Sequence, residues 1–222
     1  MKVAVFAGTP VDTHMGIQSI NKLGYEGLSY PLAETPQEQT RLQYESADYL
    51  AERFKQAVIN SRLAGAEAYF LNCNSLSSAI DYHAIAHELQ VEIISPLDIY
   101  HDLAKQAGNF LVLAANGISA YQVDRILTRE YPGRRNVTLG HLALVEAIEA
   151  GIDPDQIIED LGLKSLIQSY SQLQVPAYQL GAILLACTHF PYMKEALQRV
   201  SPLPIIDPLD YMLDRINPPH RH

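Results

Sequence analysis

The 222-residue sequence predicts an α/β fold of two pseudo-symmetric lobes, each a mainly parallel sheet flanked by helices. Apolar runs rich in strand-forming residues alternate with helical patterns along the chain, which is typical of parallel sheets with right-handed crossovers. The succession of strand, cysteine, small polar residues and helix occurs twice, around Cys73 and around Cys187. We expect one lobe at 1–95, with 201–222 returning to it, a second lobe at 96–200, and an active site in the cleft between them.

The first half opens with an apolar strand at 2–7 and a turn-rich loop at 8–13. Between 35 and 64 apolar residues recur at three- and four-residue spacing, which predicts one long helix or two broken ones. Thr35 would cap this region, Pro36 would begin it and Gly65 would end it. The other elements expected here are helices at 14–23 and 77–89, a turn and strand within 24–30, and strands at 68–71 and 91–95.

The second half repeats this alternation. Continuous apolar runs at 109–114 and 182–186 predict two strands that are buried on both faces. The second of these runs leads directly to Cys187. The remaining elements expected are helices at 99–106, 119–129, 142–150, 154–172 and 192–200, a strand at 136–139 and a short terminal helix.

The composition is that of a globular protein, with 48% hydrophobic and 18% charged residues and no run of transmembrane length. A formal net charge of −9 argues against nucleic acids and acidic membranes as partners, because both are bound by clustered Lys and Arg. The pair Arg134-Arg135 is interpreted as solvated surface. The N-terminal apolar run is too short for a signal peptide, so we expect a cytoplasmic protein with reduced thiols.

Each cysteine follows a strand and precedes a helix, which is a position that favours a reactive thiol. The positive end of the helix dipole and the N–H groups of the first turn stabilise thiolate over thiol. Two thiols on opposite sides of one carbon suit a stereoinversion, because one removes a proton while the other supplies one. His189 could shuttle a proton at Cys187. Asn74, Ser75 and Thr188 offer donors for a substrate carboxylate.

Inert buried thiols and a metal site are the competing interpretations. A buried cysteine is commonly a small apolar residue without chemistry. Cys73, Cys187 and His189 match zinc ligands in type, but their spacing is not that of a zinc ribbon and no fourth ligand is indicated. We therefore expect no metal.

The motifs that carry these residues are Cys73-Asn74-Ser75 and Leu185-Ala186-Cys187-Thr188-His189-Phe190-Pro191. They resemble the paired signatures of the cofactor-independent aspartate/glutamate racemase superfamily, and those of the glutamate racemases most of all. The similarity extends through 31–38, 108–115 and 142–146 in the expected order, and so covers nearly the whole chain.

The resemblance implies two similar lobes with the site between them, and neither pyridoxal phosphate nor a metal as cofactor. It implies that Cys73 deprotonates the D-enantiomer of an amino acid and that Cys187 deprotonates the L-enantiomer. It assigns the α-carboxylate to three residues that flank the thiols: Asn74, Ser75 and Thr188. Two further residues match family positions near the second thiol: His189 and Glu146.

The departures from the family's pattern concern the substrate pocket. Ala7-Gly8-Thr9 stands where glutamate racemases carry an Asp-Ser pair, so Asp12 is the carboxylate left to support Cys73. The family's Pro-Tyr-Gly becomes Pro31-Leu32-Ala33, and a Thr-containing loop becomes Ala115-Asn116-Gly117-Ile118-Ser119. A pocket that loses hydrogen-bond donors cannot bind a side-chain carboxylate equally well. The substrate side chain therefore stays open, with Gly8, Thr9 and Asn116 as substrate-binding candidates.

Structural roles compete with these assignments. Gly8, Thr9 and Asn116 are common turn residues, Asp12 could cap the following helix, and Glu146 could be a solvated carboxylate. Three functions remain: an amino-acid racemase, an isomerase of another small carboxylic acid, and a catalytically inactive small-molecule-binding homologue. Each takes a small amino acid or a related carboxylate as its partner, and an exposed apolar patch could support a homodimer.

Overall fold

The computed structural model describes residues 1–42, 44–106 and 108–216. The chain forms two compact units, one of Met1–Asp98 with Asp210–His222 and the other of Ile99–Leu209. Residues 217–222, the end of the segment expected to return to the first lobe, lie outside the described residues. The lobe boundaries expected from the sequence, after residues 95 and 200, stay a prediction.

The first unit is built on a four-stranded parallel sheet in the order β2-β1-β3-β4. The central strands are β1 (Lys2–Ala7) and β3 (Ala68–Asn72), and both are almost fully buried, as their apolar runs predict. β2 (Glu26–Pro31) and β4 (Ile93–Ile94) form the edges. An edge strand accommodates a proline such as Pro31, because one side of the strand carries no ladder hydrogen bonds.

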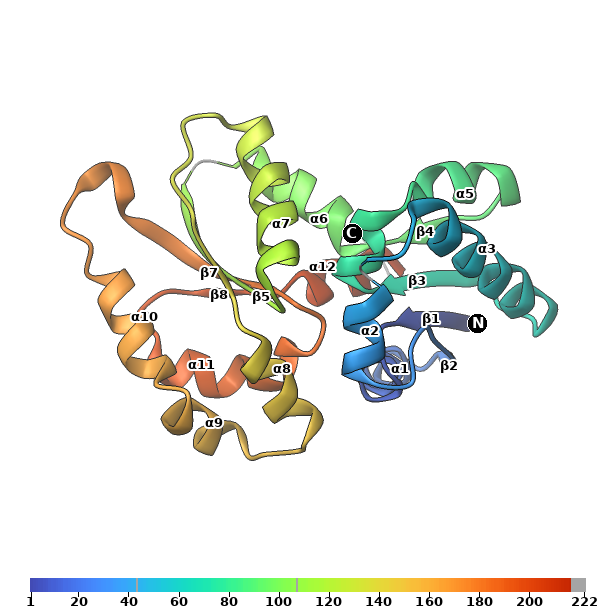
Figure 1. Ribbon diagram of the computed structural model, residues 1–222, viewed down its shortest axis with the longest axis horizontal. Helices are drawn as coiled ribbons and strands as arrows, with labels where there is room; N and C mark the ends of the chain where they lie inside the picture. The colour runs from blue at the N-terminus through green and yellow to red at the C-terminus, as the bar shows by residue number, and fades with distance from the viewer. Residues whose placement is uncertain (43, 107, 217–222) are drawn as a thin grey trace, which may run out of the picture. The chain divides into compact units, whose positions relative to one another are not determined.

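Helices cover both faces of this sheet. In Figure 1, α1 (Pro10–Lys22) lies on one side of the strands, and α3 (Ala47–Leu63) and α5 (Tyr82–Leu89) lie on the other. The inward face of α3 carries Leu50, Phe54 and Val58 at helical spacing. The remaining helices of this unit, or at its boundary, are α2 (Pro36–Leu42), α4 (Asn74–Ala79), α6 (Pro96–Ala104) and α12 (Pro208–Ile216).

Helix α1 begins at Pro10, so the loop expected at 8–13 is wrong from Pro10 onward. Thr9 is the N-cap, because its Oγ1 accepts a hydrogen bond from the Asp12 N–H at 3.2 Å. Pro10 occupies the first helical position, where its fixed φ suits the helix and its missing N–H costs nothing. The stretch Thr-Pro-Val-Asp is therefore a helix start, and this signal outweighs the turn tendency of its residues.

The long helical patterns of the first half are also divided. The region 35–64 forms α2 and α3, which confirms the broken form, and Ser46 caps α3 by accepting from the Tyr49 N–H. The helix expected at 77–89 is instead two helices, α4 and α5. Asp81 causes this break by capping α5, since its Oδ1 accepts a hydrogen bond from the Ala84 N–H.

Asp98 ties helix α12 to the body of the first unit. Its carboxylate accepts hydrogen bonds from the Tyr82 hydroxyl at 2.7 Å and from the Ser95 N–H at 3.0 Å. Arg215, on α12, places Nη1 at 3.7 Å from Asp98 Oδ2. Burial raises the pKa of Tyr82, and the bond to Asp98 adds to this rise. Together with the buried Met212, these contacts fix the last helix.

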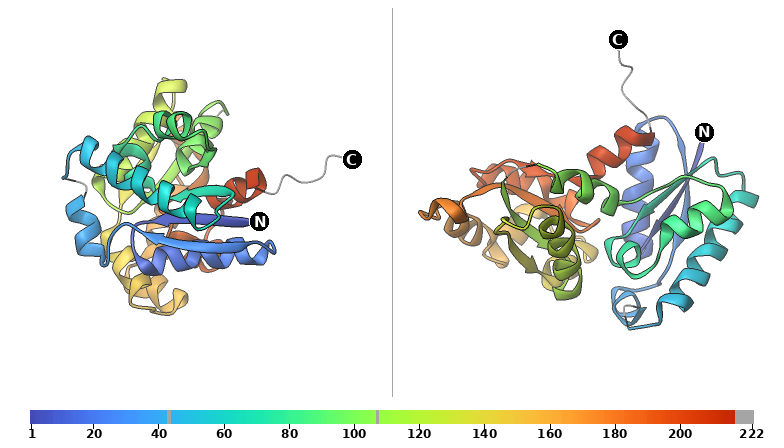
Figure 2. Two further views of the ribbon diagram at one scale, coloured as in Figure 1. Left: turned by 90° about the vertical axis from the view of Figure 1, so that its right-hand side faces the viewer. Right: turned by 90° about the horizontal axis from the view of Figure 1, so that it is seen from above.

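The second unit repeats the topology of the first, with a parallel sheet in the order β6-β5-β7-β8. β5 (Asn109–Ala114) and β7 (Leu180–Ala186) are central and buried, while β6 (Val137–Gly140) and β8 (Ile205–Ile206) are the edges. Figures 1 and 2 show α7 on one face and α8, α9 and α11 on the other. The helices are α7 (Gly117–Glu130), α8 (Leu142–Glu149), α9 (Pro154–Asp160), α10 (Leu163–Ser171) and α11 (Lys194–Val200), with short 3₁₀ turns at Pro176–Tyr178 and Phe190–Met193.

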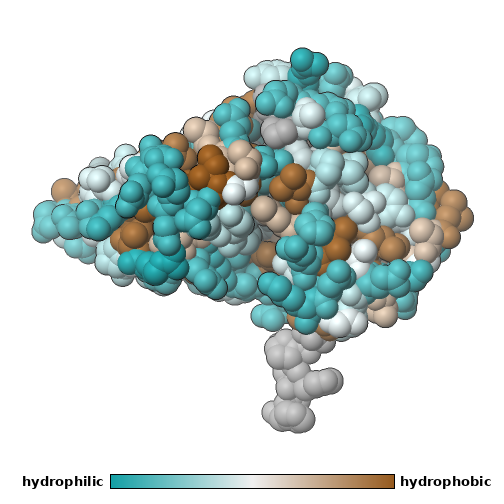
Figure 3. Space-filling view, turned by 90° about the horizontal axis from the view of Figure 1, so that it is seen from below, coloured by the Kyte–Doolittle hydropathy of each residue, from teal (hydrophilic) through white to brown (hydrophobic). Residues whose placement is uncertain are grey.

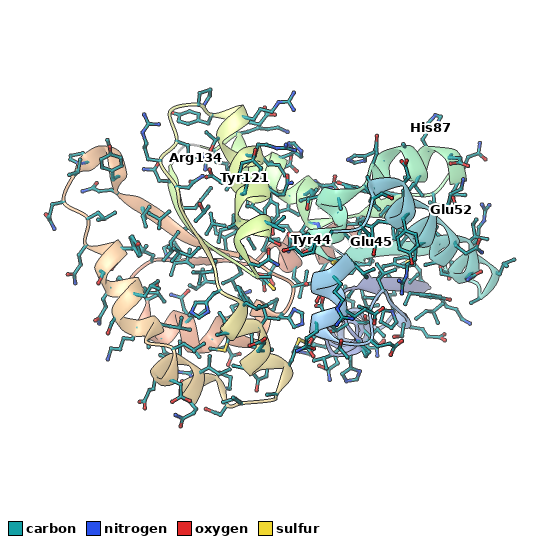
Figure 4. All side chains as sticks on the ribbon, viewed as in Figure 1. Tyr44, Glu45, Glu52, His87, Tyr121 and Arg134 are labelled. Carbon is teal, nitrogen blue, oxygen red and sulfur yellow. The ribbon has the colours of Figure 1, made fainter. Side chains whose placement is uncertain are left out.

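Two expectations for this unit need correction. The helix expected at 154–172 is interrupted before Leu163, because Gly162 adopts a left-handed conformation with φ of 61°. The interpretation of Arg134 as solvated surface is also wrong. Arg134 (labelled in Figure 4) is buried, its Nη2 donates to the Ala104 carbonyl at 3.1 Å, and its guanidinium lies 4.8 Å from the centre of the Phe110 ring. Burial lowers the pKa of this guanidinium.

The predicted fold class is confirmed by these two parallel four-stranded sheets flanked by helices. Figure 3 shows one face of the protein, on which apolar residues form small groups separated by hydrophilic ones. No helix within the described ranges is both long enough and apolar enough to cross a bilayer. Cytoplasmic location and a homodimer stay predictions.

Candidate active site

The residues around Cys73 are brought together by the register of the first sheet. β1 and β3 are parallel neighbours, and Ala7 is paired with Asn72. Both strands therefore end at the same edge, so Gly8 and Cys73 are the first residues beyond it. This edge is where ligands bind to open parallel sheets.

Cys73 is buried and forms the N-cap of α4 in an extended conformation. Its carbonyl oxygen accepts hydrogen bonds from the Ser77 N–H at 3.0 Å and the Ser77 hydroxyl at 2.6 Å. Its sulfur lies 3.9 Å from Gln39 Nε2, which donates to it from α2. The backbone of Cys73 thus starts the helix while its side chain contacts a polar group from another element.

Gln39 was not singled out by the sequence, and it reaches Cys73 because residue 8 is glycine. A Cβ at position 8 would lie 1.9 Å from Gln39 Nε2 and 2.3 Å from its Cδ. The amide therefore occupies the space that any other side chain would need. Gly8 was the indirect signal, since a glycine at a strand end often marks a close approach by another group.

A small cavity adjoins Cys73. Most of its lining is apolar and comes from the loops at the sheet edge and from α2, α3 and α4. Its polar groups come from Cys73 itself, Ser75, Gln39 and Arg53. The other lining residues are Gly8, Leu32, Leu42, Leu50, Leu76 and Ala79.

Thr9 and Asp12, two of the predicted site residues, have clear structural contacts. Thr9 caps α1, and Asp12 Oδ2 accepts a hydrogen bond from the Gly8 N–H at 3.3 Å. Both side chains are buried. The Asp12 carboxylate thus holds the loop that carries Gly8, whereas the sequence suggested direct support of Cys73.

The second unit presents the equivalent edge. Ala114 of β5 is paired with Ala186 of β7, so the turn after β5 and Cys187 lie at the same end of the sheet. Asn116 is the N-cap of α7, and its Oδ1 accepts a hydrogen bond from the Ser119 N–H at 3.0 Å. Asn116 therefore corresponds to Thr9, as each caps the helix that follows the first strand of its unit.

Cys187 is buried and contacts a histidine–carboxylate pair. Its sulfur lies 3.6 Å from His189 Nδ1, and His189 Nε2 lies 2.6 Å from Glu149 Oε1. An ionised carboxylate can only accept a hydrogen bond, so Nε2 carries a proton. In a neutral imidazole Nδ1 is then the acceptor, and it faces the thiol. The arrangement can take a proton from Cys187 and stabilise the imidazolium that results.

The carboxylate that contacts His189 is Glu149, which the sequence did not single out, while the support expected from Glu146 near the second thiol stays a prediction. Glu146 lies one turn earlier on α8 and is exposed, while Glu149 follows the buried Ile148 and reaches His189. The side chain of Glu149 is 12% exposed and that of His189 is 2% exposed. The two carboxylates are three residues apart and lie on successive turns of one side of the helix, and the sequence alone did not indicate which turn would lie beside the histidine.

The predicted carboxylate-binding residues lie directly beyond the cysteines. Asn74 is buried in the first turn of α4, and Ser75 lines the cavity beside Cys73. Thr188 is half-buried between Cys187 and His189. Neither cysteine forms a disulfide, and the described residues include no group of three or more His, Cys, Asp or Glu side chains arranged to hold a metal ion.

Comparison with known proteins gives one consistent result, although no protein-family profile matches the chain. The glutamate racemase of Klebsiella pneumoniae (strain 342) is 28% identical over 188 residues, an alignment that covers 80% of this chain and 59% of the relative. The chain thus spans about 59% of the length of curated relatives that it matches.

Solved structures share the fold. Escherichia coli glutamate racemase, in complex with L-glutamate and an activator, has a TM-score of 0.67 at 18% identity, over 97% of this chain and 80% of that one. Picrophilus torridus aspartate racemase has a TM-score of 0.66 at 15% identity, over 97% of this chain and 92% of that one. The paired motifs, the sequence similarity and the repeated parallel sheets agree, and they confirm that the chain resembles the aspartate/glutamate racemase superfamily, and the glutamate racemases in particular.

Proposed function

We propose that the chain is a cofactor-independent amino-acid racemase in which Cys73 and Cys187 exchange protons with the α-carbon. The observation that carries the proposal is the equivalence of the two thiols. Each follows the third strand of its unit in chain order, and each has a polar side chain beside its sulfur. A pair of equivalent thiols suits a substrate whose two forms are mirror images.

In one direction the thiolate of Cys73 removes the α-proton of the D-enantiomer. The C–H bond breaks, its electron pair stays on the α-carbon and is delocalised into the carboxylate, and an S–H bond forms. The thiol of Cys187 then protonates the opposite face, which gives the L-enantiomer and leaves Cys187 as thiolate. The reverse reaction exchanges the two roles, so no cofactor is consumed.

The neighbouring residues have separate tasks in this scheme. His189, supported by Glu149, accepts and returns the proton of Cys187. Asn74, Ser75 and Thr188 bind the α-carboxylate.

Residues at the adjoining strand ends complete the proposed binding region. Gly8 and Thr9 shape it on one unit through backbone groups. Asn116 shapes the binding region on the other unit. Its Oδ1 caps α7, so its amide nitrogen is the group that would contact substrate.

Incubation with L- and D-amino acids in D₂O tests the proposal. We expect NMR to show loss of the α-proton signal together with optical inversion. Cys73→Ser and Cys187→Ser should each reduce inversion by about 10²- to 10⁴-fold, the range for loss of a general acid–base group. Wild-type rates in either variant would contradict the two-thiol mechanism.

The mechanism also requires both sulfurs to reach opposite faces of one carbon. A short bis-maleimide should therefore join Cys73 to Cys187 within one chain, and mass spectrometry of the digested protein should detect the linked peptides. Failure to link, with both cysteines singly modified, would count against a shared substrate.

An isomerase of another small carboxylic acid is the second candidate. The replacement of the family's Asp-Ser pair by Gly8-Thr9 favours it, because the loss alters the substrate pocket while both thiols remain. Exchange of the α-proton of other carboxylic acids in D₂O, without exchange in any amino acid, would support this second function. Binding without any exchange would instead indicate an inactive homologue.

A further inference from the structure

The cavity beside Cys73 has a character that the proposed function does not explain. Five of its lining residues are aliphatic, and four of them come from helices α2, α3 and α4 rather than from the sheet edge: Leu42, Leu50, Leu76 and Ala79. Leu32, just beyond β2, is the fifth. A group that enters this space from the α-carbon at Cys73 meets mostly hydrocarbon.

The charge of the lining is already balanced. Among the described residues that line the cavity Arg53 is the one that is charged, and its Nη2 lies 3.9 Å from Glu38 Oε1. The two side chains are 38% and 37% exposed, so the pair lies at the solvent side of the cavity. A substrate carboxylate would have to leave water for hydrocarbon and compete with Glu38 for this guanidinium.

Gln39 adds a neutral polar group between the thiol and this lining. Its Nε2 donates to Cys73 Sγ, and its Oε1 is an acceptor that would repel a carboxylate. An uncharged side chain meets neither penalty. An aliphatic one also gains by leaving water, and a single methylene in such a pocket changes selectivity by about 10-fold or more.

We infer that this cavity is the side-chain subsite and that it takes an uncharged, mainly aliphatic amino-acid side chain in preference to an acidic one. The inference rests on the proposed racemase function, because it assigns the substrate of that same site.

The first test compares α-proton exchange in D₂O for leucine, methionine and norvaline with that for glutamate and aspartate, at equal concentrations. We expect the best uncharged amino acid to exchange at least about 10-fold faster than either acidic one. Faster exchange of glutamate or aspartate would overturn the inference and leave the racemase function intact.

A second measurement separates binding from catalysis. In Cys187→Ser protein, the rate of Cys73 alkylation by iodoacetamide is measured with each amino acid present. We expect uncharged amino acids to protect Cys73 at lower concentrations than acidic ones. If uncharged amino acids protect Cys73 but the wild-type protein exchanges none of them, the racemase function is wrong and the subsite is supported. If only acidic amino acids protect Cys73, or if none does, the subsite is wrong.

A variant tests whether the charge of Arg53 faces the substrate side chain. In the wild-type protein the Glu34 N–H donates a hydrogen bond to Glu38 Oε2. Glu38→Gln keeps an acceptor for this bond but releases Arg53 from its ion pair. We expect the ratio of glutamate to leucine exchange to rise about 10-fold, since the cation then becomes available to a substrate carboxylate.

Glu45→Gln is the matched control. Glu45 is exposed in the connection between α2 and α3, near the labelled Tyr44 in Figure 4, and it does not line the cavity. The ratio should stay at the wild-type value in this variant. An unchanged ratio in Glu38→Gln, or an equal rise in both variants, would show that Arg53 does not face the substrate side chain and would overturn the assignment of this cavity as the side-chain subsite.

Discussion

Cys73 and Cys187 occupy equivalent positions in two copies of one topology, yet their surroundings differ in kind. Cys73 contacts a neutral amide and adjoins a cavity lined by leucines. Cys187 contacts an imidazole that is held by a carboxylate. The repeated backbone therefore determines where the thiols lie, while side chains from other helices determine how each one is supported.

If the proposed racemase function is correct, this difference must appear in the reactivity of the two thiols rather than in the direction of the reaction. Enantiomers have equal free energies in an achiral solvent, so a racemase must keep equal kcat/KM values for its two substrates. The rate at which iodoacetamide alkylates each cysteine, followed peptide by peptide in the mass spectrometer, is therefore the measurement that exposes the asymmetry.

Loss of the histidine should have the largest effect. In His189→Asn we expect the alkylation rate of Cys187 at neutral pH to fall about 100-fold, because the thiol loses the base that accepts its proton. The rate for Cys73, which belongs to the other unit, should remain within about 2-fold of wild type. An equal fall at both cysteines would indicate general misfolding, which circular dichroism would detect.

The carboxylate behind the histidine should matter less. Glu149→Gln keeps a hydrogen-bond acceptor but removes the charge that stabilises an imidazolium, so we expect Cys187 alkylation to slow by about 10-fold. Glu146→Gln is the matched control on the same helix and should leave the rate unchanged. If Glu146→Gln had the larger effect, the assignment of Glu149 would be wrong.

Gln39 should give a smaller effect, and at the other cysteine. Gln39→Leu has similar bulk but no donor for the Cys73 sulfur, and we expect alkylation of Cys73 to slow by about 5-fold, since a long contact to sulfur is weaker than an ordinary bond to a charged group. Cys187 should react at its wild-type rate. Unchanged reactivity of Cys73 would show that Gln39 does not affect this thiol.

The smallest effect is expected at Gly8. In Gly8→Ala the new methyl group meets the end of a flexible side chain, which can move away, so we expect Cys73 alkylation to slow by about 2- to 3-fold. The same substitution in a Gln39→Ala background should have no effect, because the obstacle is gone. A separate effect in that background would mean that Gly8 acts on the thiol by another route.

The strands and the cysteine corners could be predicted from the sequence, because buried parallel strands are continuous apolar runs and both motifs are local. The start of α1 at Pro10 was missed because Thr, Pro and Asp also favour turns, and only the Thr9 hydrogen bond decides between the two. Gln39 and Glu149 act across the fold. Their roles depend on which turn of a helix lies beside a residue that is distant in the sequence, and a local pattern carries little information about that placement.

The discontinuity of the first unit has a consequence for biosynthesis. Its closing helix, α12, follows the whole of the second unit in the chain, and that helix supplies the buried Met212 and the Arg215 partner of Asp98. A ribosome releases polypeptide from the N-terminus onward. The first unit must therefore wait, unfinished and exposed to chaperones and proteases, until the second unit and α12 have been translated.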